Sequence, residues 1–327
     1  MSTYKAIKGQ NIRVVSSDPS NLSLGDVWYN STSNLVKARA QQASWSLTGD
    51  ISTGRCMCFT GGTKDAAWIA GGRPGNQTVS QDWDGTSFAV GNSLNTGCNS
   101  GGKAGLYNSG LRAAGNGTGA GTTSEEYDGT TWTAGGTIPT SGLPRSRTYG
   151  CAGSGLQDAA WVASGGPGGE GTPGWTTSFI YNGTTWSNTG DTQSIRWVAA
   201  ACGTESAGLF YGGYNYASAS TNTEHYNGSV FSEENNMPSG RNTWGGAGTQ
   251  SSAGGAGGAP GYSNNYFIYD GTNWSTGSTM PTPVMGSSMF GADNQNVVVG
   301  GSAIPGGYTT QGFSYIDAES TVSITTS

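Results

Sequence analysis

Four arginines recur at matching places in the chain and could hold an anionic ligand. Arg55, Arg147, Arg196 and Arg241 each stand just before a short stretch of small residues. A guanidinium group binds carboxylate or phosphate oxygens as a bidentate fork, so several of them around one opening could bind an acidic ligand. The structural alternative is that each arginine donates to loop carbonyls or to a neighbouring carboxylate inside the protein.

Aromatic residues stand among Gly, Ser and Asn in segments expected on the same side of the fold as these arginines. They are Trp175, Tyr214, Tyr216, Tyr262 and Tyr308. Flat apolar rings beside adaptable polar groups suit recognition, and a sugar ring could stack on them. The sequence therefore predicts a ligand-binding site made of these aromatics and the four arginines. The alternative is that the tyrosines seal one end of the fold or contact a neighbouring subunit.

The residues needed for catalysis or metal binding are scarce. His225 is the single histidine, so sites with several histidine ligands are excluded and any histidine-dependent triad would have to use it. The five cysteines, Cys56, Cys58, Cys98, Cys151 and Cys202, are odd in number and lack zinc-site spacing. We expect free thiols that pack as small apolar side chains. We predict no catalytic residue, no metal and no cofactor.

The composition is that of a turn-rich chain that folds. Glycine accounts for 58 of 327 residues and charged residues for only 10%, but 11 Trp and 15 Tyr supply apolar material for a core. The net charge of −6 and the lack of a basic stripe argue against nucleic-acid binding. No segment approaches the roughly 20 apolar residues of a membrane span, and no signal peptide is recognisable. We expect neither membrane insertion nor signal-dependent export.

One phrase recurs along the chain at a spacing of roughly 44 residues, which is typical of repeat architectures. It reads WDGTSF, YDGTTW, YNGTTW, YNGSVF and YDGTNW, ending at Phe88, Trp132, Trp186, Phe231 and Trp274. An apolar stretch that ends in glycine keeps the same period, at Gly72, Gly115, Gly166, Gly213, Gly258 and Gly301. The two series together predict six repeats.

The sequence of each repeat predicts four short antiparallel strands. They are an inner strand of small residues, the strand that ends in glycine, the strand with the Tyr and the strand that begins at the Trp. Asp-Gly or Asn-Gly between the last two is a strong hairpin signal, because primed turns need positive φ. We therefore interpret the phrase as a hairpin tip whose Tyr and Trp pack together or against the next repeat. Cys98 and Val284 lie near the positions that arginine occupies in other repeats.

Six repeats of four strands predict an all-β fold, a six-bladed β-propeller. The last repeat reads SYIDAES, with Ser320 where the aromatic residue is expected. SWSLTGDIST, which begins at Ser44, matches the outer strand WSTGSTMPT, which begins at Trp274. We expect this N-terminal strand to complete the last blade and to close the ring, which leaves no unpaired edge.

The repeat resembles the Kelch family, since a Gly-Gly after an apolar strand is followed by a Tyr and then a Trp. No Gly-His and Trp-Asp signature of the WD40 family is present. The resemblance covers residues 44–320 and implies a Kelch-like propeller. The single histidine excludes the copper oxidases of that family. Gly115-Asn116 replaces the Gly-Gly in the second repeat.

Residues 1–43 lack the glycine-rich period and contain a predicted β-hairpin, DVWYN-STSN-LVKARA. We separate them as an N-terminal docking segment before the propeller of residues 44–320 and a tail of residues 321–327. The segments SSDPSN and GDVWYNSTSN, followed by glycine-rich YDGTTW units, give a sequence that resembles predicted virion proteins of marine bacteriophages, especially cyanophages.

The phage resemblance implies a structural protein of a virion, such as a fibre, a tail appendage or a capsid decoration. Residues 1–43 would bind other virion proteins, and the particle would contain the chain as a homo-oligomer assembled in the host cytoplasm. Contact with a host-surface glycan is a further expectation for the loops.

The enzymatic alternative is a sialidase-like glycoside hydrolase. Sialidases are six-bladed propellers that use an arginine cluster, a tyrosine and carboxylates. Their Asp box reads Ser-x-Asp-x-Gly-x-Thr-Trp, whereas YDGTTW places Asp128 directly beside Gly129. Carboxylates such as Glu170 are few in the arginine-side loops, which leaves little material for paired-carboxylate hydrolysis. We therefore favour a protein that is not an enzyme.

Overall fold

The regular secondary structure of the described residues is almost entirely β-strand. The structure is a computed structural model, and it describes residues 12–139, 150–166, 174–292, 295–303 and 307–324. Within these ranges helix is confined to one 3-10 turn, η2 (Ala120–Thr122), and none is long and apolar enough to cross a membrane. The chain divides into two compact units, residues 45–315 (the repeat unit) and residues 1–44 with 316–327 (the terminal unit).

The repeat unit contains five four-stranded antiparallel sheets, each made of strands consecutive in the chain. The first sheet consists of β4 (Phe59–Gly62), β5 (Ala67–Ala70), β6 (Ser80–Trp83) and β7 (Phe88–Val90). The second consists of β8 (Gly102–Leu106), β9 (Ser109–Ala113), β10 (Ser124–Tyr127) and β11 (Trp132–Ala134).

The next three sheets repeat this arrangement. The third is made of β12 (Ala152–Leu156), β13 (Ala159–Ala163), β14 (Ser178–Tyr181) and β15 (Trp186–Thr189). The fourth is made of β16 (Ala200–Gly203), β17 (Gly208–Tyr211), β18 (Thr223–Tyr226) and β19 (Phe231–Glu234). The fifth is made of β20 (Gly245–Gly248), β21 (Ala253–Ala256), β22 (Tyr266–Tyr269) and β23 (Trp274–Thr276).

A six-stranded sheet combines strands from both ends of the chain. Its order is β1-β2-β3-β29-β26-β25. The strands are β25 (Ser288–Ala292), β26 (Gln295–Val299), β29 (Gly312–Ile324), β3 (Leu35–Thr48), β2 (Val27–Asn30) and β1 (Arg13–Val15). Trp45 on β3 packs against Tyr315 on β29 with ring centroids 5.1 Å apart. The N-terminal strand therefore lies beside the last strand of the repeats. A separate three-stranded sheet contains β24 (Val284–Met285), β27 (Ser302–Ala303) and β28 (Gly307–Tyr308).

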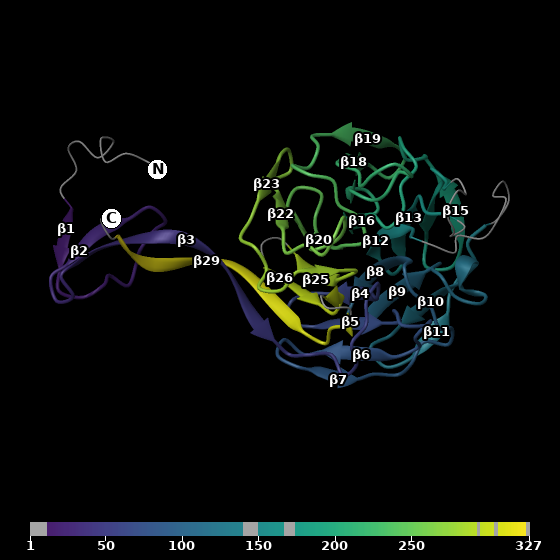
Figure 1. The fold of residues 1–327 in the computed structure, drawn as a ribbon, viewed down its shortest axis with the longest axis horizontal. Coiled ribbons are helices and arrows are strands. Elements are labelled where there is room, and N and C mark those ends of the chain that lie inside the picture. Colours follow the sequence, from purple (N-terminus) through teal and green to yellow (C-terminus); the bar gives the residue numbers. More distant parts are fainter. Residues whose placement is uncertain (1–11, 140–149, 167–173, 293–294, 304–306, 325–327) are drawn as a thin grey trace. The chain divides into compact units, whose positions relative to one another are not determined.

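The inner strands of neighbouring sheets pack on one another around the centre of the repeat unit (Figure 1). β8 contacts β4 and β12, β16 contacts β12 and β20, and β25 contacts β20 and β4. A Cβ atom at Gly102 of β8 would lie only 2.5 Å from Val162 Cγ1 of the third sheet, so glycine permits this close approach. The several four-stranded antiparallel sheets are consistent with the predicted β-propeller.

The recurring phrase forms hairpin tips, as predicted. In the second sheet, Asp128 N–H donates to the Thr131 carbonyl at 3.3 Å. Gly129, the first residue between them, has φ +90°, a conformation that glycine adopts without strain. The Asp128 carboxylate accepts the N–H groups of Thr130 and Thr131, both at 2.7 Å, and these bonds lower the pKa of Asp128. Glycine therefore supplies the positive φ, and Asp caps the turn.

The Tyr and Trp of the phrase pack both together and against a neighbouring sheet, as expected. Tyr127 stacks on Trp132 with centroids 4.8 Å apart, and Trp132 meets Trp68 of the first sheet edge-on at 5.1 Å. Tyrosine hydroxyl groups also link sheets, because Tyr127 donates to Asp82 at 2.9 Å and Tyr181 donates to Glu126. The phrase is part of the scaffold.

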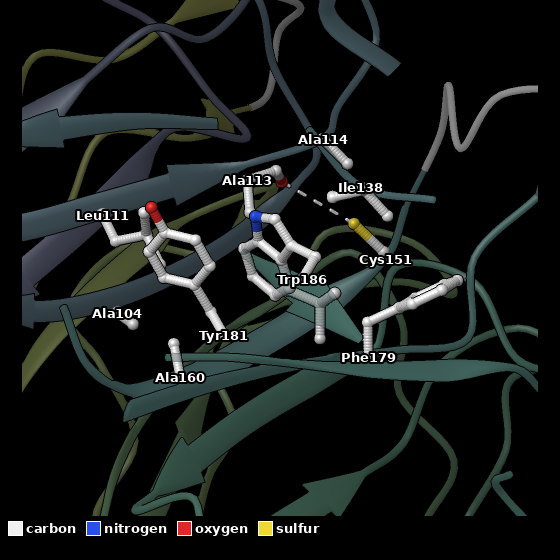
Figure 2. Close-up of a cluster of buried hydrophobic side chains, with 11 residues drawn as sticks. Ala104, Leu111, Ala113, Ala114, Ile138, Cys151, Ala160, Phe179, Tyr181 and Trp186 are labelled. Carbon is white, nitrogen blue, oxygen red and sulfur yellow. Dashed lines mark hydrogen bonds between the residues drawn. The ribbon is translucent and has the colours of Figure 1, made fainter. Parts of the chain in front are cut away.

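Figure 2 shows one of the core clusters between two sheets. Leu111 comes from the second sheet, while Phe179 and Trp186 come from the third, and each is at most 5% exposed. Burying a side chain of this kind stabilises the fold by about 1.5–3 kcal/mol. Cys151 lies in the same cluster, with Sγ 3.9 Å from the Ala113 carbonyl oxygen.

The terminal unit contains the predicted hairpin, formed by β2 and the first part of β3. Asp18 organises it: its carboxylate accepts from Trp28 Nε1 at 3.0 Å, from Asn30 Nδ2 at 2.7 Å and from Lys37 Nζ at 2.7 Å. The bond from Lys37, followed by those from Asn30 and Trp28, lowers the pKa of Asp18 to about 2. The SSDPSN and DVWYN stretches are therefore parts of one local structure.

The unit boundaries differ from the predicted domains at the C-terminal end. The repeat unit starts at Trp45 and ends at Tyr315. Residues 316–327 group with the N-terminal residues, although the sequence prediction assigned residues up to 320 to the propeller and 321–327 to a tail. β29 continues as one strand from Gly312 to Ile324 and so runs across the predicted boundary at residue 320.

Candidate functional site

The residues before the inner strands occupy equivalent positions in the repeats. At each of these positions, the main-chain carbonyl accepts a hydrogen bond from the N–H of a glycine in the preceding repeat, at 2.7–3.2 Å. The accepting residues are Arg55, Cys98, Arg196, Arg241 and Val284, and the donors are Gly301, Gly72, Gly165, Gly213 and Gly258 in that order. The predicted equivalence of Cys98 and Val284 with the arginines is confirmed.

Two residues farther along, six main-chain hydrogen bonds form a closed series. Each N–H donates to the carbonyl of the equivalent residue in the preceding repeat, at 2.7–3.1 Å. The series runs through Met57, Ser100, Gly150, Val198, Thr243 and Gly286 and returns to Met57, and all six have positive φ. We call the side of the repeat unit that carries this series, together with the connections between second and third strands, the loop face.

The side chains of Arg55 and Arg196 are buried, and their charges do not face solvent. Arg196 is 0% exposed and donates to the carbonyls of Gly212 at 3.0 Å and Asn222 at 2.7 Å, and to the Glu224 carboxylate. Its guanidinium carbon lies 4.2 Å from the centroid of the Phe210 ring. Arg55 is 1% exposed and makes the matching bonds to Gly71, Val79 and the Gln81 side chain. These contacts correspond to the structural alternative considered for the arginines.

Arg112 makes the same network in the second repeat, where Cys98 occupies the arginine position. Arg112 comes from β9, is 0% exposed, and donates to the Thr123 carbonyl at 3.0 Å and to the Glu125 carboxylate. Glu125 also accepts the N–H of Asn95 at 2.7 Å and of Thr96 at 3.0 Å. Sequence reasoning missed Arg112. The available signal was the missing arginine at Cys98 together with an acidic residue at Glu125.

Arg241 is the partly exposed arginine of the predicted group. Its Nη1 donates to the Gly240 carbonyl at 3.3 Å, and its Nε has no hydrogen-bond partner. Phe267 occupies the place that Glu224 has in the fourth repeat, so no carboxylate stands there for Arg241. Arg147 falls outside the described residues.

Three aromatic residues of the fourth repeat gather on the loop face. The connection between β17 and β18 carries Tyr214 and Tyr216, and Trp197 precedes β16. The Trp197 and Tyr216 rings meet edge-on with centroids 4.8 Å apart, and Trp197 and Tyr214 lie 6.2 Å apart. The Tyr214 hydroxyl donates to the Tyr216 carbonyl at 3.0 Å. Trp197 is buried, whereas Tyr216 is 36% exposed. The sequence prediction named both tyrosines but not Trp197.

The other predicted aromatics lie apart from this group in the repeats. Trp175 precedes β14 and is half-buried, with its N–H donating to the Gly165 carbonyl at 2.8 Å. Tyr262 is half-buried in the connection before β22. Tyr308 is 41% exposed at the end of β28. Among the described residues, these three have no ring contact like those of Tyr214 and Tyr216.

Residues of the inner strands line two small, open pockets, with volumes of about 80 Å³ and 180 Å³. Lys103 lines both of them. Its ammonium group donates to Thr60 Oγ1 at 2.6 Å, to the Met289 carbonyl at 2.6 Å and to the Gly246 carbonyl at 3.4 Å. Burial lowers the pKa of Lys103 to about 8, while the Cys202 and Cys58 thiols act in the opposite direction. The sequence analysis did not single out this lysine.

The histidine and the cysteines take part in local packing. His225 Nε2 lies 3.0 Å from the Tyr269 hydroxyl and Nδ1 lies 3.3 Å from Glu234 Oε1. All five cysteines are free thiols, and burial raises the pKa of Cys56 and Cys202 to about 12. Over the described ranges, no group of three or more His, Cys, Asp or Glu side chains could hold a metal ion.

Comparison with known proteins gives a likeness of fold. No family model matches the sequence, and no curated protein matches it. A solved structure described as "Structure of YjhT" aligns with a TM-score of 0.65 at 11% sequence identity, over 81% of this chain and 95% of that chain. At this identity the likeness concerns the fold alone, which is all-β and consistent with a β-propeller.

Proposed function

We propose that this protein is a structural and recognition component of a bacteriophage particle. It is a six-bladed, Kelch-like propeller that residues 1–43 dock onto other virion proteins. Its loop face contacts a host-surface glycan or another virion protein. It acts as a homo-oligomer in the particle, which is assembled in the host cytoplasm, and it performs no catalysis. Support for the virion role comes from the likeness of SSDPSN, GDVWYNSTSN and the YDGTTW units to marine phage virion proteins.

Three observations favour six blades in a closed ring. The six hydrogen bonds from Met57 through Gly286 return to their starting residue. The inner strand β25 packs against β4 as well as β20. The strand with Trp45 lies next to β29, which gives the last repeat a fourth strand. A closed ring of blades leaves only short, protected sheet edges, which limits edge-to-edge aggregation.

The observation that carries the recognition role is the aromatic group of Trp197, Tyr214 and Tyr216 on the loop face. An exposed tyrosine backed by other rings offers a flat, rigid surface at small entropic cost. The buried arginines argue against the sialidase-like alternative, because Arg196 and Arg112 are already paired with Glu224 and Glu125. These carboxylates are buried as well and are poorly placed to act on a substrate.

The recognition role is tested by applying the purified protein to a glycan array and to host envelope fractions. We expect retention on at least one of them. A protein that is retained on neither, and whose two faces are both buried in a reconstruction of the whole particle, would be a pure decoration protein. Absence of the chain from purified particles would remove the virion role itself.

The enzymatic alternative has an independent test. A fluorogenic sialoside should not be hydrolysed by the purified protein. Turnover that disappears on changing Arg147 and Arg196 would replace our proposal with a glycosidase.

A further inference from the structure

A strained backbone conformation displays Tyr216 at the tip of the connection between β17 and β18. Tyr216 has φ +75°, although it is neither glycine nor asparagine. A bulky residue with positive φ is an outlier in proteins, and such strain concentrates at binding sites, where surrounding structure enforces it.

The surroundings of Tyr216 explain how the strain is maintained. The Asn215 carboxamide oxygen accepts the N–H groups of Ala217 at 3.2 Å and Ser218 at 3.0 Å, while Asn215 N–H donates to the Ser218 carbonyl at 3.2 Å. Tyr214 holds the Tyr216 carbonyl through its hydroxyl. The turn is therefore fixed by its neighbours, and asparagine or glycine at position 216 would fit it with less strain.

Rings and polar groups surround the exposed tyrosine. Trp197 supports it edge-on from below. The main chain of Arg241 is bonded to both ends of the same connection, because Gly213 N–H donates to the Arg241 carbonyl at 2.7 Å and Arg241 N–H donates to the Ser220 carbonyl at 3.2 Å. A partly exposed ring beside the Tyr214 hydroxyl and the Asn215 side-chain amide matches the two sides of a pyranose, which has apolar C–H faces and a polar rim.

We propose that Tyr216 is the stacking residue of a saccharide-binding site whose other members are Tyr214, Trp197 and Arg241. This inference rests on the proposed recognition role and adds which residue makes the stacking contact and which part of a glycan it binds, a pyranose ring. The apolar face of the sugar lies on the Tyr216 ring, and the polar side chains bind its hydroxyl groups. The strained turn keeps the ring in position before the ligand arrives, which lowers the entropic cost of binding.

The test compares three variants with the wild-type chain on a glycan array of pyranose oligosaccharides, with affinities for the retained glycan measured by calorimetry. Tyr216→Asn should weaken binding about tenfold or more, as loss of a stacking contact of roughly 1.4 kcal/mol would do. Tyr216→Phe should remain within about threefold of wild type, because the ring is kept. Leu156→Asn is the control, an exposed apolar residue at the end of β12 outside the predicted site, and should bind as wild type.

A stability measurement separates binding from folding. Tyr216→Asn should leave the thermal midpoint within about 3 °C of wild type or raise it, since relief of strain offsets the lost ring contact. If the wild-type chain binds a glycan and Tyr216→Asn binds it equally well, the site assignment is wrong and the recognition role stands. If the wild-type chain binds no glycan, both the site and the glycan part of the function are wrong.

Discussion

The second and fourth repeats build the same buried network from arginines at different places in the sequence. In the fourth repeat Arg196 enters from the segment before the inner strand and pairs with Glu224. In the second repeat that segment carries Cys98, and Arg112 reaches the equivalent Glu125 from the adjacent strand β9. Phe210, which lies under the Arg196 guanidinium, takes the place of Arg112 in the fourth repeat. The structure thus preserves a charge position in space rather than in sequence.

The comparison clarifies what the recurring arginines do. Arg196 bonds the carbonyls at the end of the second strand and before the third, Gly212 and Asn222, Arg55 bonds the equivalent pair, and Arg112 bonds the Thr123 carbonyl. The Asn222 carbonyl also accepts the Gly212 N–H at 3.0 Å, so the guanidinium adds a second hydrogen bond at this point. An arginine supplies several donors in a fixed plane. The network therefore holds the bases of the loops in place, and the loop tips are left for recognition.

The largest expected effect comes from breaking one of these buried pairs. Arg196→Met leaves Glu224 buried without its charged partner, and we expect a loss of about 3–5 kcal/mol in the free energy of unfolding. Urea denaturation measures this loss. Adding Glu224→Leu should recover most of it, because the uncompensated charge is removed. If Arg196→Met alone lowers the free energy of unfolding by less than about 1 kcal/mol, the central role of the pair is contradicted.

The second test transfers the fourth-repeat arrangement into the second repeat. Arg112→Phe alone leaves Glu125 without an arginine and should destabilise the protein by about 3 kcal/mol. Adding Cys98→Arg supplies a guanidinium from the position that Arg196 uses. We expect the double variant to recover about 2 kcal/mol, as the coupling in a double-mutant cycle of unfolding free energies. Strictly additive effects would mean that the two arginine positions are not interchangeable.

The smallest expected effect contrasts the buried Arg196, which has a carboxylate partner, with the half-buried Lys103, which has none. Lys103 donates only to a hydroxyl and to carbonyls, and its pKa falls to about 8. Between pH 8 and its unfolded value near 10.4, the unfolded chain binds more protons at Lys103 than the folded chain, so this contribution to stability increases with pH, by at most about 1.4 kcal/mol per pH unit.

The thiols impose a pH dependence of opposite sign, and a variant separates the two. Cys56 and Cys202 have pKa values raised to about 12 by burial, so their contribution to stability is lost as the pH rises above the unfolded thiol value. The difference in urea midpoint between wild type and Lys103→Met isolates the lysine. We expect the urea midpoint of wild type to rise relative to that of Lys103→Met between pH 8 and pH 10. An unchanged difference would show that Lys103 titrates normally.

The sequence predicted the repeated scaffold well because its signals are local. The hairpin at Asp128-Gly129 follows from the turn preference of two neighbouring residues, and the pairing of Trp132 with Tyr127 follows from their positions across that turn. The outer position of the strand with Trp45 was also predictable, because its sequence matches another outer strand.

The sequence predicted the candidate site less well because burial depends on contacts between distant residues. Arg55 and Arg241 look alike in the chain, yet Gln81 is available to bind the first and Phe267 stands at the equivalent place in the fifth repeat. The strained φ of Tyr216 and the support from Trp197 depend on the path of the connection, which its Gly, Ser and Asn residues do not determine alone.

The central claim is that the recurring arginines belong to the scaffold, beneath a loop face that binds through its turn tips. Native labelling with phenylglyoxal, read by mass spectrometry, tests this claim most directly. The account predicts that Arg73, which is exposed, and Arg241 are modified, whereas Arg55, Arg112 and Arg196 are protected until the protein unfolds. Modification of Arg55 or Arg196 in the folded protein at the rate of Arg73 would contradict it.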